Sequence, residues 1–320
     1  MKKILLASTA LVGFAGAAAA EISLSGYAEI GIDGGNLGYE TQFHNDWQVN
    51  FNFSSTMDSG VEFGGKVQIE ESNSPAAING AVTSDDEAFW VSGAFGKVTL
   101  GETDGAFDWA LSEIYTGTGI SDDHSTHAGA YWFTGLDATY DNQIMRYEYS
   151  FGDFAAALSA EMDDTGVGDT NYALGGKWSG TVSGLDVGVG VGYQDNGVNS
   201  VWGLSGSAGF SNGFSVALGY ADLDGTSDAV GNGVPSDSWW GVGVAYTPAT
   251  MSALTVGVNY GEYQATSASG MADPSGWGIV ANYDLGGGAV AMASYGSSDN
   301  GGAGNGHGDQ TWSLGLGMSF

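Results

Sequence analysis

Seven carboxylates fall between residues 104 and 142, a stretch that contains neither Lys nor Arg. They are Asp104, Asp108, Glu113, Asp122, Asp123, Asp137 and Asp141. Carboxylate oxygens are hard ligands that suit Ca²⁺, and a cluster of them attracts cations in general. We therefore expect a strongly negative segment here, with Asp104, Asp108 and Glu113 as candidate calcium ligands and no cofactor required.

Histidines offer a second kind of chemistry. The four are His44, His124, His127 and His307. His124 and His127 lie beside Asp122 and Asp123, but a zinc site needs four well-placed ligands, so a polar loop is the favoured interpretation. A hydrolase would need a Ser, a His and an acid held together. All four histidines fall in segments expected to be loops, which disfavours that mechanism. The absence of Cys excludes thiolate nucleophiles and disulfides.

The charge balance is strongly acidic. The 320 residues hold 37 Asp and Glu against 6 Lys and Arg, for a net charge of −31 and a pI near 4.1. Such a chain lacks the basic surface of a nucleic-acid-binding protein. With 42% hydrophobic and 12% aromatic residues, it is also unlike a disordered chain.

Residues 1–20 have the three parts of a secretory signal peptide. Lys2 and Lys3 give a basic start, an apolar run follows, and small residues lead up to Ala20. We expect cleavage after Ala20 and a mature chain of residues 21–320. Lys66, Lys97, Arg146 and Lys177 are then its only bases.

Alternation of apolar and polar residues runs through the mature chain. Ile22, Leu24 and Ile30 alternate with polar or small residues, as along a strand with one apolar face. Sixteen such segments are predicted. They are residues 21–33, 46–57, 61–71, 86–94, 97–103, 143–151, 154–163, 171–179, 185–194, 200–210, 214–223, 238–247, 253–264, 275–284, 289–298 and 309–320.

The predicted connections alternate between short turns and generally longer loops rich in Gly, Asp, Asn and Ser. No stretch after the signal approaches the ~20 apolar residues of a membrane helix. Tight turns on one rim and long loops on the other are typical of an outer-membrane barrel, with the short turns periplasmic and the long loops external. The fold class predicted is an all-β transmembrane antiparallel barrel of sixteen strands.

The polar face of these strands indicates a water-filled lumen. Gln48, Asn50, Gln68 and Glu70 would point inward, and barrels of this strand number leave an aqueous channel. Aromatic residues near strand ends suit the membrane-interface girdles of barrels, although for any single one of them core packing is the favoured interpretation. They are Trp178, Tyr193, Tyr220, Trp239, Tyr246, Tyr283 and Trp312.

Three local sequences resemble the general porins of alphaproteobacteria. They are TMDSGVEFGG at residues 56–65, VSGAFGKVTLG at 91–101 and ANYDLGGG at 281–288. Their order and spacing, the signal peptide and the alternating ending up to Phe320 extend the resemblance over the mature chain. The resemblance implies a Gram-negative outer-membrane protein, a homotrimer of sixteen-stranded barrels surrounded by lipid. It also implies passage of small hydrophilic solutes and contact of Phe320 with the outer-membrane assembly machinery.

In that family one long loop folds into the barrel and narrows the pore, which implies this role for residues 104–142. The family's opposite wall carries a basic cluster. Lys66, Arg146 and Lys177 are the matching residues here, a depleted set.

Three classes of function therefore remain open. The favoured one is a passive diffusion channel that prefers cations and is not an enzyme. The others are an outer-membrane barrel hydrolase and a soluble β-rich adhesion or calcium-binding protein.

Overall fold

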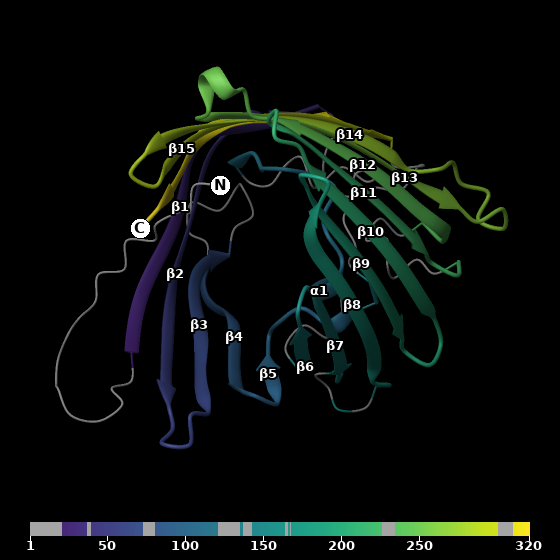
Figure 1. The fold of residues 1–320 in the computed structure, drawn as a ribbon. Helices are drawn as coiled ribbons and strands as arrows, with labels where there is room; N and C mark the ends of the chain where they lie inside the picture. Colours follow the sequence, from purple (N-terminus) through teal and green to yellow (C-terminus); the bar gives the residue numbers. More distant parts are fainter. Residues whose placement is uncertain are drawn as a thin grey trace.

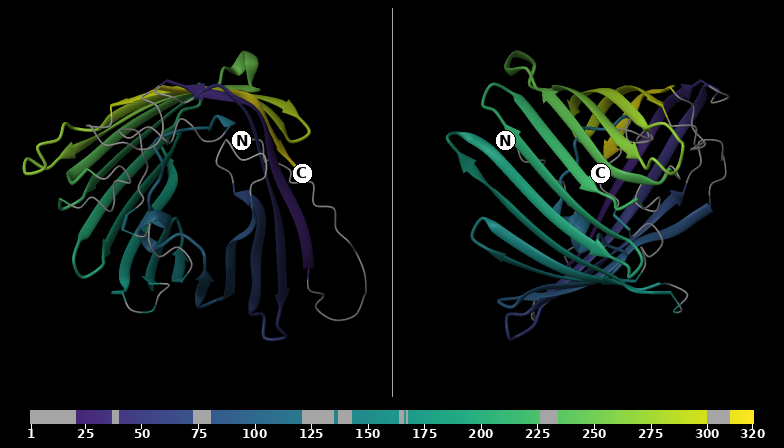
Figure 2. Two further views of the ribbon diagram at one scale, coloured as in Figure 1. Left: turned by 180° about the vertical axis from the view of Figure 1, so that it is seen from behind. Right: turned by 90° about the vertical axis from the view of Figure 1, so that its right-hand side faces the viewer.

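The computed structural model describes residues 21–36, 40–72, 81–120, 135–136, 143–163, 166, 168–225, 234–299 and 310–320. These residues form a closed barrel in which each strand pairs antiparallel with its sequence neighbours and β16 pairs with β1 (Figures 1 and 2). The predicted sixteen-stranded antiparallel barrel is thus confirmed. No helix among the described residues is long and apolar enough to cross a membrane.

The strands have the following bounds. They are β1 (Glu21–Gly35), β2 (Gln42–Thr56), β3 (Glu62–Ser72), β4 (Ala81–Gly93), β5 (Gly96–Gly101), β6 (Ile144–Phe151), β7 (Phe154–Glu161), β8 (Asn171–Val182), β9 (Leu185–Asp195), β10 (Ser200–Gly209), β11 (Phe214–Asp222), β12 (Ser236–Tyr246), β13 (Leu254–Ala265), β14 (Ser275–Gly286), β15 (Ala289–Asp299) and β16 (Gln310–Ser319). Two short helices accompany them, α1 (Ala106–Ala110) and η3 (Ala249–Met251).

Strand β2 begins earlier than the sequence pattern predicted, and this changes the position of one histidine. His44 was expected in a loop, but it lies within β2, where it pairs with Gly31 of β1. The expectation was wrong because Phe43 and His44 continue the alternation: Phe43 is exposed and His44 is buried. The polar composition of residues 40–46 concealed that pattern.

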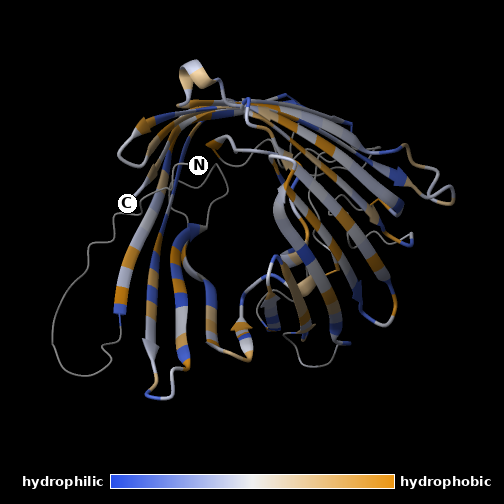
Figure 3. Cartoon of the chain, in the orientation of Figure 1, coloured by the Kyte–Doolittle hydropathy of each residue, from blue (hydrophilic) through white to orange (hydrophobic). Residues whose placement is uncertain are grey.

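The two faces of the barrel wall differ as the alternation predicted. Outward residues are large and apolar, such as Leu174 on β8, whereas Asn171 on the same strand is buried on the inner side. Figure 3 shows this alternation as blue and orange bands along the strands. Lipid offers no hydrogen-bond partners, so a lipid-facing wall needs an apolar exterior. Closure of the barrel meets the second requirement, because it pairs the backbone groups of every strand.

Aromatic residues form a belt on the outer face near the external loops of β9 to β16. One Tyr or Trp per strand contributes: Tyr193, Trp202, Tyr220, Trp240, Tyr260, Trp277, Tyr295 and Trp312. Successive members are cross-strand neighbours; the Trp202 and Tyr220 rings, for example, lie 5.3 Å apart. Of the two interpretations weighed for Trp239, core packing is the one observed: Trp239 is 2% exposed and packs with Tyr263, and Trp240 takes the place in the belt.

The seam between the first and last strands is completed by the C-terminal residue. The main-chain N–H of Phe320 donates to Gly26 O at 2.9 Å, and the Gly26 N–H donates to Phe320 O at 3.1 Å. The Phe320 ring itself is exposed on the outer surface. Its backbone therefore closes the barrel while its side chain remains available to a partner.

Candidate functional site

The chain after β5 enters the barrel and follows its inner wall. Helix α1 packs against β7, β8 and β9, inside the ring of strands (Figure 1). Beyond it, Ile114 lies against β12, and Ile120 reaches β16 and β1. The fold prediction that one loop enters the barrel is met by the described part of this loop, residues 102–120 and 135–136. We call this described part the inner loop.

Glycines on the wall let the inner loop approach closely. A Cβ atom added at Gly175, Gly190 or Gly243 would lie 2.0, 2.0 and 1.5 Å from the main-chain oxygens of Ala106, Ala110 and Ile114, respectively. Backbone therefore meets backbone at these points, where no side chain fits. The high glycine content of the chain has a specific use here.

Apolar side chains of the inner loop turn toward the wall. Phe107 and Ile114 are each 1% exposed and belong to a cluster that includes Val201, Trp239 and Tyr263 of the strands. Removing these apolar side chains from the water of the lumen is favourable, so their burial stabilises the inner loop against the wall. One side of the lumen is thus filled by a packed hydrophobic layer.

A buried polar network fixes both arms of the inner loop. Glu161 is fully buried and accepts hydrogen bonds from Ser159 Oγ (3.0 Å) and Gln194 Nε2 (2.7 Å). Ser159 Oγ in turn accepts from the Ala106 N–H at 2.9 Å, on the outgoing arm. Gln194 Oε1 accepts from the Leu136 N–H at 2.5 Å, on the returning arm. Strand side chains therefore hold residues thirty positions apart in the loop.

Three of the seven predicted acids lie in the described part of the loop. The Asp104 side chain is 71% exposed, and Asp108 and Glu113 are half-buried. Burial raises the pKa of the Glu113 carboxyl to about 8, and repulsion from Asp104 adds to this shift. Asp122, Asp123, Asp137 and Asp141 lie outside the described residues. Within the described part, no group of three or more His, Asp or Glu is arranged to hold a metal ion.

The bases lie differently from the arrangement that the resemblance implied. Arg146 and Lys177 lie on β6 and β8, under the inner loop rather than across the lumen from it, and both contact its main chain. Lys66 lies on β3 and forms an ion pair with Asp86. Lys97, near the β4–β5 turn, pairs with Glu148 at 3.4 Å. Each of the four bases in residues 21–320 is therefore engaged by an acid or a carbonyl.

The sequence analysis did not predict a cluster of one histidine and two carboxylates on β1 and β2. His44 Nε2 lies 3.2 Å from Glu29 Oε2, and His44 Nδ1 lies 3.9 Å from Asp33 Oδ2. All three are buried. The only hydrogen-bond partner recorded for His44 within the described chain is Glu29, so no serine hydroxyl completes a hydrolase triad there. The continued alternation through Phe43 was the signal that could have placed this histidine on a strand.

A closed sixteen-stranded barrel with one loop inside its lumen defines the class of outer-membrane porins. The chain matches the family model for Gram-negative porins over residues 7–303, and it belongs to that family. This is a family of non-enzymatic channels of the Gram-negative outer membrane, as predicted from the sequence.

Individual relatives agree with this assignment. A porin of Rhodobacter capsulatus is 35% identical over 154 residues, which are 47% of this chain and 48% of that protein. The match thus spans about half the length of that curated relative. A porin structure refined at 1.8 Å is 26% identical with a TM-score of 0.70, covering 94% of this chain and 100% of the other. A triple mutant of Rhodopseudomonas blastica porin, 19% identical with a TM-score of 0.66 and covering 93% and 100%, shares the fold.

Proposed function

We propose that this protein forms a water-filled channel for passive diffusion of small hydrophilic solutes and ions, with a preference for cations. One observation carries the proposal: the inner loop brings Asp104, Asp108 and Glu113 into the lumen, while every base of residues 21–320 is already engaged. Asp104 Oδ2 lies 4.0 Å from Arg146 Nη1, and Glu113 becomes negative only as the pH rises through about 8, so the cation preference depends on the excess of acids over the four bases. An excess of carboxylates beside a narrow aqueous path concentrates cations, because low-dielectric walls focus the field.

Reversal potential under a tenfold KCl gradient across a planar bilayer tests the proposal. The expected sign is that of a cation-selective pore, weakening at molar salt because the Debye length falls from about 8 Å at 0.15 M to about 3 Å at 1 M. The triple variant D104N/D108N/E113Q should move the reversal potential toward zero, most strongly at about pH 9, where Glu113 is ionised in the wild type. An anion-selective sign, an unchanged potential in the triple variant, or no conductance at all would contradict the proposal.

Calcium enters this proposal as a competing counter-ion rather than a required cofactor. Above about pH 8, where Glu113 is also ionised, the carboxylates of Asp104, Asp108 and Glu113 are oxygen ligands that suit Ca²⁺ better than K⁺. Millimolar CaCl₂ should therefore reduce the K⁺ current through the wild-type channel and have less effect on the triple variant. An equal reduction of the K⁺ current by CaCl₂ in the wild type and the triple variant would show that these three acids do not bind the blocking Ca²⁺.

The functional unit we propose is a homotrimer in lipid. The aromatic belt near the external loops covers β9 to β16. Outward residues near the external ends of β1, β2 and β4 to β6 include no Tyr or Trp: they are Ile30, Val82, Leu100 and Met145, each about half exposed, and Phe43, which is 86% exposed. Belts of Tyr and Trp mark contact with the lipid interface, so the sector without them is the face that other copies would cover. Cross-linking in mild detergent should yield a trimer, and the charged variant L100E should shift it to monomers.

Export and assembly follow the same proposal. Glu21 is the first residue of β1, so cleavage after Ala20 would leave the strand intact. N-terminal sequencing of the protein from outer membranes should begin at Glu21. Phe320 would contact the assembly machinery through its exposed ring.

A further inference from the structure

We propose that Arg146 and Lys177 are positioning residues that hold α1 against the wall and thereby set the bore of the channel, rather than its electric field. This inference rests on the proposed channel function. It assigns two of the four bases to the inner loop itself, which they contact near the two ends of α1.

Arg146 holds the start of the helix. Its side chain, on β6, is only 8% exposed, and Nη1 donates a hydrogen bond to the main-chain oxygen of Asp104. The same guanidinium lies 4.0 Å from Asp104 Oδ2 and 3.9 Å from Glu148 Oε2. Its charge is therefore compensated by carboxylates and directed at the loop backbone, which leaves little of it to act on ions in the lumen.

Lys177 holds the end of the helix. Its Nζ donates to the main-chain oxygen of Trp109 at 2.8 Å and lies 3.7 Å from the centroid of the Trp109 ring. A cation at a helix C-terminus is favourable, because the last carbonyls lack intrahelical partners. The Trp109 ring adds a cation–π contact, and the Arg146 guanidinium lies 6.0 Å from the same ring. Trp109 thus lies within reach of both bases.

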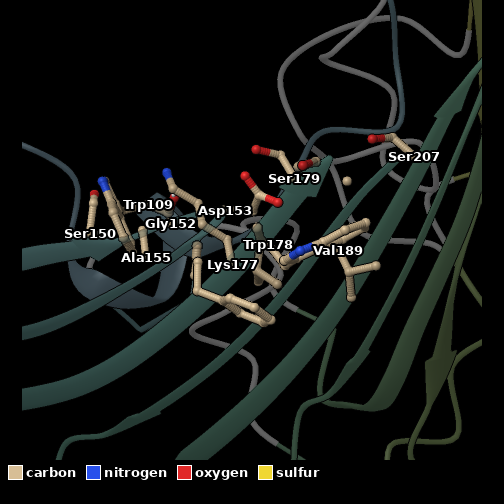
Figure 4. Close-up of a pocket in the computed structure, with 15 residues that line it drawn as sticks. Trp109, Ser150, Gly152, Asp153, Ala155, Lys177, Trp178, Ser179, Val189 and Ser207 are labelled. Carbon is tan, nitrogen blue, oxygen red and sulfur yellow. The ribbon is translucent and has the colours of Figure 1, made fainter. Parts of the chain in front are cut away.

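Both ends of α1 are bonded to strand side chains, and the second end also borders open space. The first end is bonded at Ala106 to Ser159, next to the buried Glu161 network. A cavity of about 450 Å³ lies beside the second end, lined by Trp109 to Ser112 and by Gly152 and Asp153 of the β6–β7 turn, and is shown in Figure 4. Lys177 lines this cavity and reaches across to Trp109 (Figure 4). Ser205 Oγ also accepts a hydrogen bond from the Ser112 N–H at 2.9 Å, so loss of Lys177 loosens this end beside the open cavity rather than releasing it completely.

A base that sets the field would present its charged group to lumen water, as Asp104 presents its carboxylate. Arg146 and Lys177 instead direct their donors at main-chain oxygens. Hydrogen bonds with a charged donor are among the stronger ones. Loss of one raises the ratio of detached to attached loop by roughly tenfold to a hundredfold.

Single-channel recording of R146M and K177M separates the two roles. A positioning role predicts greater open-channel noise and higher mean conductance, with a reversal potential close to that of the wild type. It also predicts that K177R, which keeps a donor, restores the wild-type noise. The matched control K97M removes the same charge from a lysine that has no recorded contact with the inner loop, and it should record like the wild type.

The variant W109L provides a second test that does not depend on the folding of R146M and K177M. W109L leaves every charge in place and removes only the ring beside Lys177, so noise should rise while the reversal potential stays constant. A clear shift of reversal potential in R146M or K177M with unchanged noise would overturn the inference in favour of a field role. Unchanged noise in W109L, R146M and K177M together would also overturn it. Absence of conductance in the wild type would instead refute the channel itself.

Discussion

Two walls of this barrel both have an apolar outer face but differ on their inner faces. We call β7 to β13 the loop-bearing wall and β2 to β4 the bare wall. Inward residues of the bare wall are long and polar: Gln48, Asn50, Asn52, Lys66, Gln68 and Glu70. At matching inward positions the loop-bearing wall has Gly175, Gly190, Gly192, Gly203, Gly241, Gly243 and Gly257.

The difference follows from what each wall contacts. Polar side chains on the bare wall are solvated by the lumen, as expected for a wide barrel. The loop-bearing wall instead receives a polypeptide, so its inward positions must be small enough for backbone to pass. A lumen can therefore be narrowed on one side without changing the pattern that faces lipid.

The largest effect should come from a side chain added to the loop-bearing wall. In G243A the new Cβ would overlap Ile114 O, a main-chain atom that cannot rotate away. Overpacking of this kind costs about 1–3 kcal/mol or more, so the inner loop should detach and conductance should rise. In the control G206A the nearest atom is 4.0 Å away, and conductance should be unchanged. Equal conductance of the two variants would show that the loop does not depend on this contact.

The next effect concerns the network that ties both loop arms to the wall. E161Q replaces a fully buried carboxylate that accepts bonds from Ser159 and Gln194. We expect a loss of about 1.5–3 kcal/mol in loop attachment, measured as faster protease cleavage of the inner loop. The control E262Q makes the same change on β13, where the carboxylate bonds to Tyr260 and Gln264. Faster cleavage in the control as well would point to general destabilisation.

Acidity should affect selectivity through Glu113. Its pKa is raised to about 8, so the carboxyl is mostly neutral at pH 7 and becomes negative as the pH rises through 8. Cation preference should therefore increase between about pH 7 and about pH 9, and the reversal potential in E113Q should stay constant over this range. In the unfolded chain the ordinary pKa of 4.5 applies, so attachment of the loop should weaken as pH rises from 4.5 to 8. A preference independent of pH in the wild type would contradict this assignment.

The smallest effect on the finished channel is expected at the seam, far from either inner face. F320A keeps the two backbone hydrogen bonds to Gly26 and removes only an exposed ring. Yield in outer membranes should fall severalfold, while protein refolded in detergent should conduct like the wild type. Replacement of another exposed ring, as in F154A, controls for the general loss of apolar surface. Equal yields of F320A and wild type would contradict a role in assembly.

The sequence by itself determined the barrel, because alternation is a local property of each strand. Sixteen strands, the short and long connections, the aqueous lumen and the acidic loop could all be predicted without knowing which segments meet. His44 was misplaced because the start of β2 was set too late, and the face of Trp239 stayed open because adjacent residues in a strand point to opposite sides.

Only the tertiary structure decided how the inner loop lies on its wall. The contact of Gly243 with Ile114 and the bond of Lys177 to Trp109 join residues far apart in sequence, and no periodicity encodes such pairs. The same holds for Gln194: its sequence position predicts only an inward polar residue, and the fold places its side chain against the Leu136 N–H. Charge counts could show that bases are few, but the path of the chain decided that those few hold the loop, because a cation bonds to whichever oxygens the fold brings within reach.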